Sequence, residues 1–174
     1  MAKRGYKVDV YERRPDMRKL NLGGGRSINL ALSDRGLKAL KAVGLESEIR
    51  DMAIPMHGRL IHMADGTIGG LQPYGEKGQY INSISRGGLN ELLMTEAEKN
   101  ANVTFHFNIR SIEIDKELNE VVLENLETQE QFTTQSDMVF ATDGAYSAVR
   151  NSMEKTDRFD YSQHYLPHGY KELS

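Results

Sequence analysis

Apolar and polar residues alternate with two different periods along the chain, and these periods predict both strands and helices. A short alternating run at residues 6–11 predicts a strand, and the segment Ala2-Lys3-Arg4-Gly5 before it looks like the last turn of a helix with its glycine stop. A helix that ends in glycine and leads into such a strand is typical of the middle of a βαβ unit. Residues 34–45 repeat their apolar positions at near-helical spacing, with Ser33 as the expected N-cap.

The next part of the chain has the two-residue alternation of strands. A short helical turn at 46–52 ends before Pro55. Residues 58–64 and 67–73 then flank Asp65-Gly66, a dipeptide favoured in tight hairpin turns. A third strand is predicted at 79–85. Ser85 is the expected cap of a helix over 86–100, which has leucines on one face.

The second half is predicted to be mostly β-structure. Strands are expected at 103–107, 110–115, 120–125 and 131–135, and the later ones are expected to form a meander. The apolar run at 137–142 ends on Asp143-Gly144, which predicts a buried parallel strand that leads into a binding loop. We therefore expect one domain over 1–174 with an α/β fold of α+β character. It would combine part of a Rossmann-like dinucleotide-binding layer with an inserted antiparallel β-sheet and a meander.

Composition excludes several classes of function. The chain has 174 residues, 39% of them hydrophobic and 27% charged, which is typical of a globular domain. Its net charge of −3 argues against a nucleic-acid binder. The absence of cysteine excludes disulfides, thiolate metal sites and a cysteine nucleophile. No apolar stretch approaches the roughly 20 residues of a membrane span, so a cytoplasmic chain without a membrane segment is predicted.

Glu12 is the first candidate for a binding role, because it stands at the end of the predicted strand at 6–11. An acidic residue there accepts hydrogen bonds from the ribose of a dinucleotide in βαβ units. A solvated charge at a strand end is an equally good interpretation. The glycine turn that would decide between them, G-x-G-x-x-G, does not occur in the sequence. Gly23-Gly24-Gly25 lies after the acidic strand, and a flexible loop is the better interpretation there.

The segment "FATDGAYSAVR" is the second candidate. Gly144 would let the backbone approach a phosphate-bearing cofactor, Asp143 would accept from ribose hydroxyls, and Arg150 would reach a pyrophosphate. The alternative is a turn in which Asp143 caps a short helix, and taken alone the segment favours this alternative.

Three residues on or beside the predicted strands of the middle region could bind an anionic substrate. An arginine next to a tyrosine, as with Arg59 and Tyr74, can hold a carboxylate by a bidentate pair and a hydroxyl donor, and Arg86 lies nearby in the sequence. No metal site is predicted, because Pro167 prevents a helix between the one suitably spaced pair of histidines, His164 and His168.

Taken together, six segments of the chain resemble the kynurenine 3-monooxygenase family of FAD-dependent aromatic hydroxylases. These segments are "VDVYERR", "GRSINLALSDRGLKALKAVGL", "IPMHGRLIH", "PYGEKGQYINSISR", "ATDGAYSAVR" and "RFDYSQHYLPHGYKELS". They occur in the family's order and spacing and cover essentially the whole chain. The resemblance implies an enzyme that uses FAD and NADPH to activate oxygen and convert kynurenine to 3-hydroxykynurenine. The flavin would perform the oxygen chemistry, so no catalytic side chain is assigned.

The resemblance also implies roles for individual residues. Glu12 would bind the ribose, with Tyr11, Arg13 and Arg14 beside the adenosine. Ala31 would lie near the flavin, Arg86 would contact FAD, and the backbone at Ser111 would lie in the adenine region. Asp143 and Gly144 would belong to a loop that serves FAD and NADPH, with Ala148 close by. Arg59 and Tyr74 would bind the amino-acid carboxylate of kynurenine.

The sequence departs from the family in two respects, and both affect what is expected of this chain. The family's first strand with its G-x-G-x-x-G turn is missing, as is everything after "KELS". We therefore expect the chain alone to bind FAD weakly or not at all and to be inactive. The flanks of "YKVDVYE" and "DMVFATD" would be exposed sheet edges, which predicts self-association. Two alternatives remain: a hydroxylase of another aromatic acid, and a noncatalytic self-associating remnant.

Overall fold

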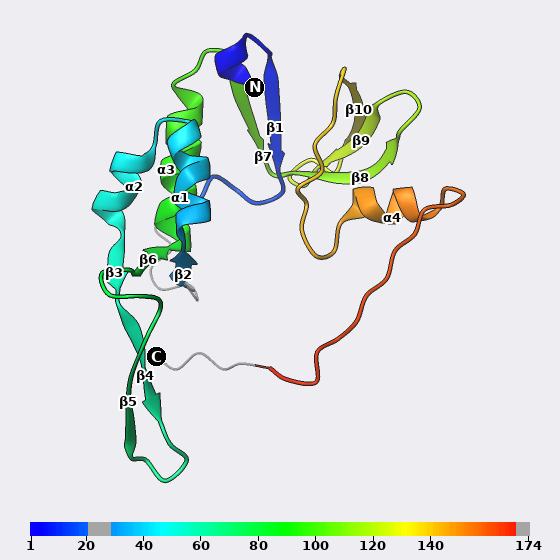
Figure 1. Ribbon diagram of the computed structural model, residues 1–174. Coiled ribbons are helices and arrows are strands. Elements are labelled where there is room, and N and C mark those ends of the chain that lie inside the picture. The colour runs from blue at the N-terminus through cyan, green and yellow to red at the C-terminus, as the bar shows by residue number, and fades with distance from the viewer. Residues whose placement is uncertain (21–28, 170–174) are drawn as a thin grey trace. The chain divides into compact units, whose positions relative to one another are not determined.

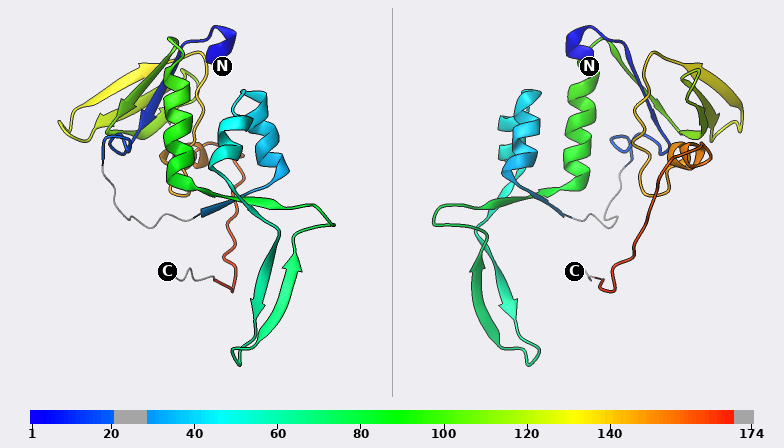
Figure 2. Two further views of the ribbon diagram at one scale, coloured as in Figure 1. Left: turned by 90° about the vertical axis from the view of Figure 1, so that its left-hand side faces the viewer. Right: turned by 45° about the vertical axis from the view of Figure 1, so that its right-hand side comes forward.

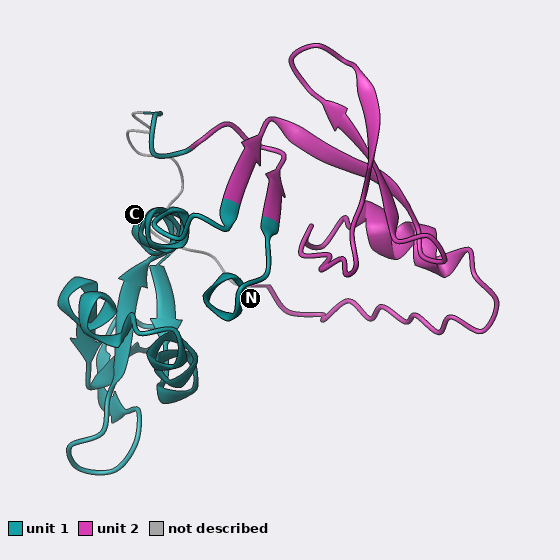
Figure 3. Ribbon diagram, turned by 90° about the horizontal axis from the view of Figure 1, so that it is seen from above, with its two compact units in different colours: residues 1–8, 17–103 teal, residues 9–16, 104–174 magenta. Residues whose placement is uncertain are grey.

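The computed structural model describes residues 1–20 and 29–169 of the chain. They form two compact units (Figure 3). Unit 1 comprises Met1–Val8 and Met17–Val103, and unit 2 comprises Asp9–Asp16 and Thr104–Ser174. Each unit has a buried core of its own. This division does not test whether residues 1–174 form one domain, so the single domain stays a prediction. The predicted loop at Gly23-Gly24-Gly25 lies outside the described residues.

Unit 1 begins with a short 3-10 helix, Ala2–Arg4, that ends at Gly5 with a φ of 89°. This left-handed conformation favours glycine, and it confirms the predicted helical turn and stop. The other elements of unit 1 in chain order are β2 (Asn29–Leu32), α1 (Asp34–Ala42), α2 (Glu46–Met52), β3 (Ile54–Met56), β4 (Gly58–His62), β5 (Ile68–Pro73), β6 (Ile81–Ser85) and α3 (Arg86–Glu98) (Figure 1).

The core of unit 1 lies between a three-stranded sheet and helices. The sheet is antiparallel with the order β2-β6-β3, so the predicted third strand pairs with β2 and β3. Burial of leucines at the predicted helical spacing holds α1 and α3 to this sheet. The buried residues are Leu32, Leu37, Ile49 and Ile84, and Leu40, Leu45, Leu89 and Leu92 pack against them.

Serine stands at the start of both long helices of unit 1, but only one of these serines uses its side chain as a cap. Ser85 Oγ accepts a hydrogen bond from Gly88 N at 3.2 Å, which confirms the predicted cap of α3. Ser33 occupies the N-cap position of α1 without a side-chain cap hydrogen bond. The side chain of Ser33 therefore does not stabilise α1 in the predicted way.

The hairpin of β4 and β5 projects beyond the helices and the three-stranded sheet of unit 1 (Figure 2). Its loop confirms the predicted Asp65-Gly66 turn, since Asp65 Oδ1 accepts from Thr67 N at 3.0 Å and Gly66 has a φ of 84°. The register shifts between Ile61 and His62, which marks a β-bulge.

Unit 2 is built mainly from strands. Its elements are most of β1 (Val8–Glu12) and of β7 (Val103–Phe107), followed by β8 (Ile109–Asp115), β9 (Glu120–Asn125), β10 (Gln131–Gln135) and α4 (Ala148–Glu154). β1 and β7 pair, and their arrows point the same way in Figure 1. β8, β9 and β10 form the antiparallel meander that the sequence predicts. The core consists of Ile109, Val121 and Leu123, against which Tyr11, Ile114 and Val139 pack.

One predicted strand of unit 2 is wrong. Residues 137–142 were expected to form a buried parallel strand, but they have no strand structure. Met138 is 62% exposed and Phe140 is 67% exposed. In the described part of the chain no strand pairs with this segment, and an extended apolar run becomes a strand only when its backbone groups find such a partner.

Candidate functional site

The loop before α4 brings together several of the predicted cofactor residues of unit 2. Asp143 Oδ2 accepts hydrogen bonds from the backbone N–H groups of Ala148 at 2.8 Å and Val149 at 3.3 Å. Ser147 Oγ donates to Asp143 Oδ1 at 2.5 Å and itself accepts from Arg150 N at 2.9 Å. Asp143 and Ser147 thus satisfy the N–H groups that a helix start leaves unpaired.

The hydrogen bonds of this loop set the ionisation of Asp143. Partial burial acts to raise the pKa of the Asp143 carboxyl, but the hydrogen bonds from Ser147 and from the backbone of Val149 and Ala148 outweigh it, so the pKa is lowered. The carboxylate is therefore held ionised as a cap. This geometry is the capping alternative of the sequence analysis, and the ribose role of Asp143 stays a prediction.

Gly144 and Arg150 complete the same loop. Gly144 has a φ of 83°, and a Cβ added there would meet nothing within 4 Å, so the position needs glycine for its backbone and leaves open space beside it. Arg150 Nη2 donates to Ala145 O at 2.6 Å, and its guanidinium lies 5.0 Å from the centre of the Tyr161 ring. The Arg150 side chain is thereby engaged within unit 2.

The end of β1 holds a second group of predicted residues. Glu12 Oε1 accepts from Arg14 N at 2.9 Å and from Arg14 Nε at 3.1 Å. Tyr11 stacks on the ring of His106, with ring centres 4.6 Å apart, and His106 Nε2 lies 2.9 Å from Asp9 Oδ1. Glu12 is the last residue of β1, so it stands at the strand end as predicted, and it pairs with the Arg14 guanidinium. Arg13 is exposed beside this pair.

Ser111, the predicted residue of the adenine region, lies at an irregularity of the meander. The register between β8 and β9 shifts between Ser111 and Glu113, so β8 bulges there. A bulge turns backbone groups out of the regular ladder, which is what a backbone contact to a base requires.

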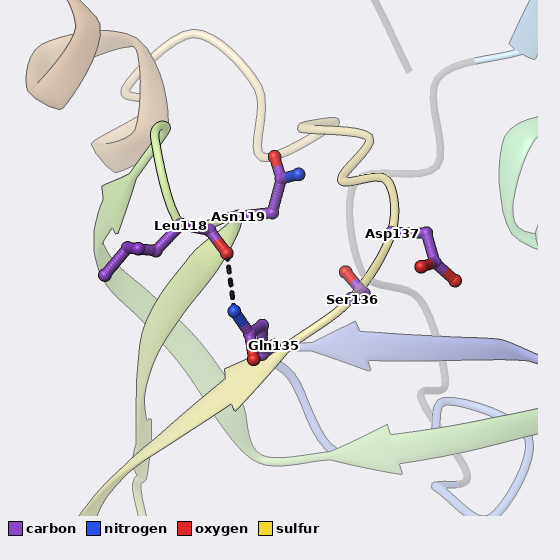
Figure 4. Close-up of a pocket in the computed structure, with 5 residues that line it drawn as sticks. All are labelled: Leu118, Asn119, Gln135, Ser136 and Asp137. Carbon is purple, nitrogen blue, oxygen red and sulfur yellow. Dashed lines mark hydrogen bonds between the residues drawn. The ribbon is translucent and has the colours of Figure 1, made fainter.

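A hollow lies where β10 ends beside the turn between β8 and β9 (Figure 4). None of the predicted residues lines it. Its lining residues are Leu118, Asn119, Gln135, Ser136 and Asp137.

In unit 1, Ala31 and Arg86 belong to neighbouring elements. Ala31 on β2 pairs with Ser83 on β6, and Arg86 is the first residue of α3, directly after β6. Both residues are exposed. Their nearness along β6 agrees with a shared role, but their predicted contacts with FAD stay predictions.

Arg59 and Tyr74 lie on the same face of the β4–β5 hairpin. Arg59 pairs with Gln72, and Tyr74 N donates to His57 O at 3.2 Å, so the register runs on from Gly58 and Pro73 to His57 and Tyr74. Opposite residues, and residues two apart on one strand, share a face of a sheet. Arg59, Gln72 and Tyr74 therefore point to one side, as carboxylate binding by Arg59 and Tyr74 requires.

The sequence analysis missed one participant on this face, Gln72. Its Oε1 accepts from Arg59 Nε at 2.7 Å, which orients the guanidinium and leaves its terminal N–H groups directed elsewhere. The signal was present in the hairpin register, because the Asp65-Gly66 turn sets residue 59 opposite a residue close to 72. The capping role of Ser147 was likewise not predicted.

The predicted residues are divided between the two units. Arg59, Tyr74, Ala31 and Arg86 belong to unit 1. The others belong to unit 2: Tyr11, Glu12, Arg13, Arg14, Ser111, Asp143, Gly144 and Ala148. Within each unit the structure groups them as described.

Comparison with known proteins identifies the family. Residues 2–165 match the family described as "FAD binding domain". The chain belongs to this family. It is also 47% identical to kynurenine 3-monooxygenase of Sus scrofa over 100% of its own length and 36% of that protein's length. It is 46% identical to kynurenine 3-monooxygenase of Myxococcus xanthus, over 100% of its own length and 38% of that protein's length. The resemblance inferred from sequence motifs is thereby confirmed.

A solved structure supports the same fold. The flavin-dependent monooxygenase PieE, in complex with FAD and substrate, superposes with a TM-score of 0.74 at 14% identity, over 88% of this chain and 28% of that chain. This confirms the α/β fold class. The chain spans less than two fifths of the length of the relatives from Sus scrofa and Myxococcus xanthus. None of the helices in the described ranges has the length and apolar character needed to cross a membrane.

Proposed function

We propose that the chain serves in the FAD- and NADPH-dependent hydroxylation of kynurenine. The observation that carries this proposal is the 47% identity to kynurenine 3-monooxygenase of Sus scrofa along the entire chain. Bound FAD supplies the oxygen chemistry, and NADPH supplies the reducing electrons. The residues of this chain bind and orient the reactants.

The hairpin face supports the substrate part of the proposal. A guanidinium fixed by Gln72, with a tyrosine as its diagonal neighbour, presents several donors to one carboxylate. The Gln72 contact uses Nε of Arg59, so both terminal nitrogens of the guanidinium stay available as far as the described residues are concerned. Kynurenine has such a carboxylate on its amino-acid side chain. Arg59, Gln72 and Tyr74 are therefore proposed to hold this end of the substrate.

The cofactor part rests on the residues at the strand ends. Glu12 is proposed to accept from ribose hydroxyls, since Arg14 occupies only its Oε1 among the described residues. The affinity of this chain alone for FAD is expected to be low. The first N–H groups of α4 are already taken by Asp143 and Ser147, so they are not available to a pyrophosphate.

A related function on the same residues is the hydroxylation of a different aromatic acid. Arg59 and Tyr74 would bind the carboxylate of a benzoate as well as that of an amino acid. Substrate choice depends on the groups that surround the ring, and the carboxylate-binding face does not decide it.

The cofactor proposal is tested by titrating FAD with the purified chain and following the quenching of flavin fluorescence. We expect weak but saturable quenching, loss of the flavin absorbance band on desalting, and weaker quenching by the Glu12→Ala variant. The matched control is Glu48→Ala, an exposed carboxylate on α2. Equal quenching by both variants would remove Glu12 from the site. Turnover of kynurenine by the chain with NADPH would contradict the expected inactivity.

The substrate proposal is tested by NMR titration of the labelled chain with kynurenine, salicylate and 4-hydroxybenzoate. We expect kynurenine to shift the amide signals of the β4–β5 hairpin and the Arg59→Gln variant to lose this response. Arg35→Gln, an exposed arginine on α1, is the control. A stronger response to either benzoate would favour the hydroxylase of another acid. No response of the hairpin to any of the three would refute the assignment of Arg59 and Tyr74.

A further inference from the structure

β10 forms one edge of the meander, and the composition of its residues is unusual for an edge strand. In the sheet order β10-β9-β8 it has β9 on one side and no strand of the described residues on the other. Its sequence is Gln-Phe-Thr-Thr-Gln, without charge, proline or glycine, and its five residues pair with β9 in unbroken register. Edge strands are normally protected by charges, prolines or bulges, and β10 has none of these.

Most of the other edge strands carry such protection. β8 has the bulge at Ser111, and β1 contains Asp9 and Glu12. Pro55 lies in β3, and the β4–β5 hairpin has a bulge as well as Pro73. Two edge strands remain, β7 and β2. β7 contains a polar histidine, His106. β2 is also uncharged, but its four residues Asn-Leu-Ala-Leu would set Asn29 against Leu32 if two copies met in antiparallel orientation.

The backbone pattern shows which groups of β10 face outward. Asn125 N donates to Glu130 O at 2.9 Å, and Ser136 N donates to Asn119 O at 3.3 Å. Residues of an antiparallel strand alternate between bonding inward and outward, so the even-numbered residues of β10 bond to β9. The N–H and C=O groups of Gln131, Thr133 and Gln135 therefore point away from β9.

The outward groups of β10 can form hydrogen bonds with the same groups of a second β10. If a second β10 lies antiparallel about Thr133, then Gln131 faces Gln135 of the other copy at both ends and Thr133 faces Thr133 at the centre. Each facing pair consists of two outward residues, so every outward N–H meets an outward C=O. Thr–Thr pairs are among the favourable cross-strand pairs, and no like charges meet.

We propose that β10 is a self-association edge, which pairs antiparallel with β10 of a second copy of this chain about a two-fold axis at Thr133. The contact is isologous, since the same strand is used by both copies, and it therefore closes as a dimer. It joins the two meanders into one continuous sheet. The association predicted at the flanks of residues 6–12 and 137–143 stays a separate prediction.

Side-chain burial supports the same register. Phe132 and Thr134 pair with Leu123 and Val121, so they lie on the face of the meander that carries the core. Phe132 is 42% exposed in the single chain. In the dimer it would face Thr134 of the other copy, an aromatic–β-branched pair that covers part of its ring. Association therefore removes apolar surface from water in addition to forming backbone hydrogen bonds.

The first test uses a cysteine at the proposed axis, because the chain has no cysteine of its own. In the proposed register the two Cα atoms of residue 133 lie about 5.5 Å apart, within the range that a disulfide spans. We expect Thr133→Cys to form a covalent dimer when oxidised with diamide. The control, Thr104→Cys, places a cysteine on the exposed edge region of β7 and is expected to stay monomeric on a nonreducing gel. Absence of the Thr133→Cys dimer, or equal crosslinking of both variants, would overturn the proposal.

The second test measures association without a crosslink. Thr133→Lys would set two ammonium groups against each other at the axis, so we expect its dimer dissociation constant in sedimentation equilibrium to rise roughly tenfold or more. Thr104→Lys makes the same charge change and is expected to leave the dimer unchanged. Circular dichroism checks that both variants are folded. A monomeric parent chain, or a dimer weakened only by Thr104→Lys, would refute association through β10.

Discussion

The meander and the segment that follows it, residues 137–147, show two outcomes of one kind of sequence prediction. Both contain apolar runs that predict strands. In the meander, Val121 and Leu123 are at most 8% exposed and the strands pair as expected. In the following segment, Met138 and Phe140 are largely exposed and no strand forms.

The difference lies in where each strand finds its partner. The strands of the meander are joined by short turns, such as the one in which Asp115 Oδ1 accepts from Glu117 N at 2.9 Å and Asn119 adopts a φ of 52°. Each strand therefore meets its partner next along the chain. A parallel partner has to come from a distant segment, and the described residues do not provide one for 137–142.

The largest effect is expected from a substitution in the core of the meander. Leu123 is 2% exposed and contacts Ile109 and Val121. Leu123→Ala would leave a cavity there, and we expect it to lower the free energy of unfolding by about 3 kcal/mol. Urea denaturation followed by circular dichroism measures the change. A loss below about 1 kcal/mol would mean that the meander is not the stable part of unit 2.

Most of the fold could be predicted because its order comes from local signals. Gly5 ended a helical turn, Ser85 capped α3, and Asp65-Gly66 turned the hairpin. Each of these features depends on the chemistry of one or two neighbouring residues. The wrong strand at 137–142 was the prediction that depended on a distant partner, and composition carries no information about such a partner.

The site was predictable to a smaller extent. The sharing of one face by Arg59 and Tyr74 follows from hairpin register, so the sequence already contained it. The engagement of Glu12 by Arg14, and of Asp143 by Ser147, depends on rotamers that sequence spacing does not determine. The motif at 143–150 was compatible with both a ligand loop and a helix cap. The hydrogen bonds of the loop show the cap, and the ligand role stays a prediction.

The capping loop offers a test of intermediate size within the segment that forms no strand. Asp143→Asn keeps the shape but replaces an accepting oxygen by an NH2 group, and we expect a loss of about 1 kcal/mol at neutral pH. Because the folded pKa of Asp143 is lowered, its contribution is complete above the ordinary carboxyl pKa and is lost as the pH falls through the folded value. The free energies of unfolding of parent and variant, measured by urea denaturation, should therefore become equal in acid. For the control Asp160→Asn, at another exposed carboxylate, they should differ little at any pH.

The smallest effect is expected at Phe140, and it tests directly whether residues 137–142 are exposed in solution. A phenylalanine in a buried strand costs about 3–5 kcal/mol when truncated to alanine. Phe140 is 67% exposed, so Phe140→Ala should change the free energy of unfolding by less than about 0.5 kcal/mol in urea denaturation. Phe105→Ala, on β7, is the matched truncation of a half-buried ring that stacks on Phe107 and should cost more. A loss at Phe140 equal to that at Phe105 would show that residues 137–142 are covered in solution, because only a buried ring can lose that much. The apolar run would then be buried in solution, as the sequence predicted, although strand pairing would need a separate measurement such as amide hydrogen exchange.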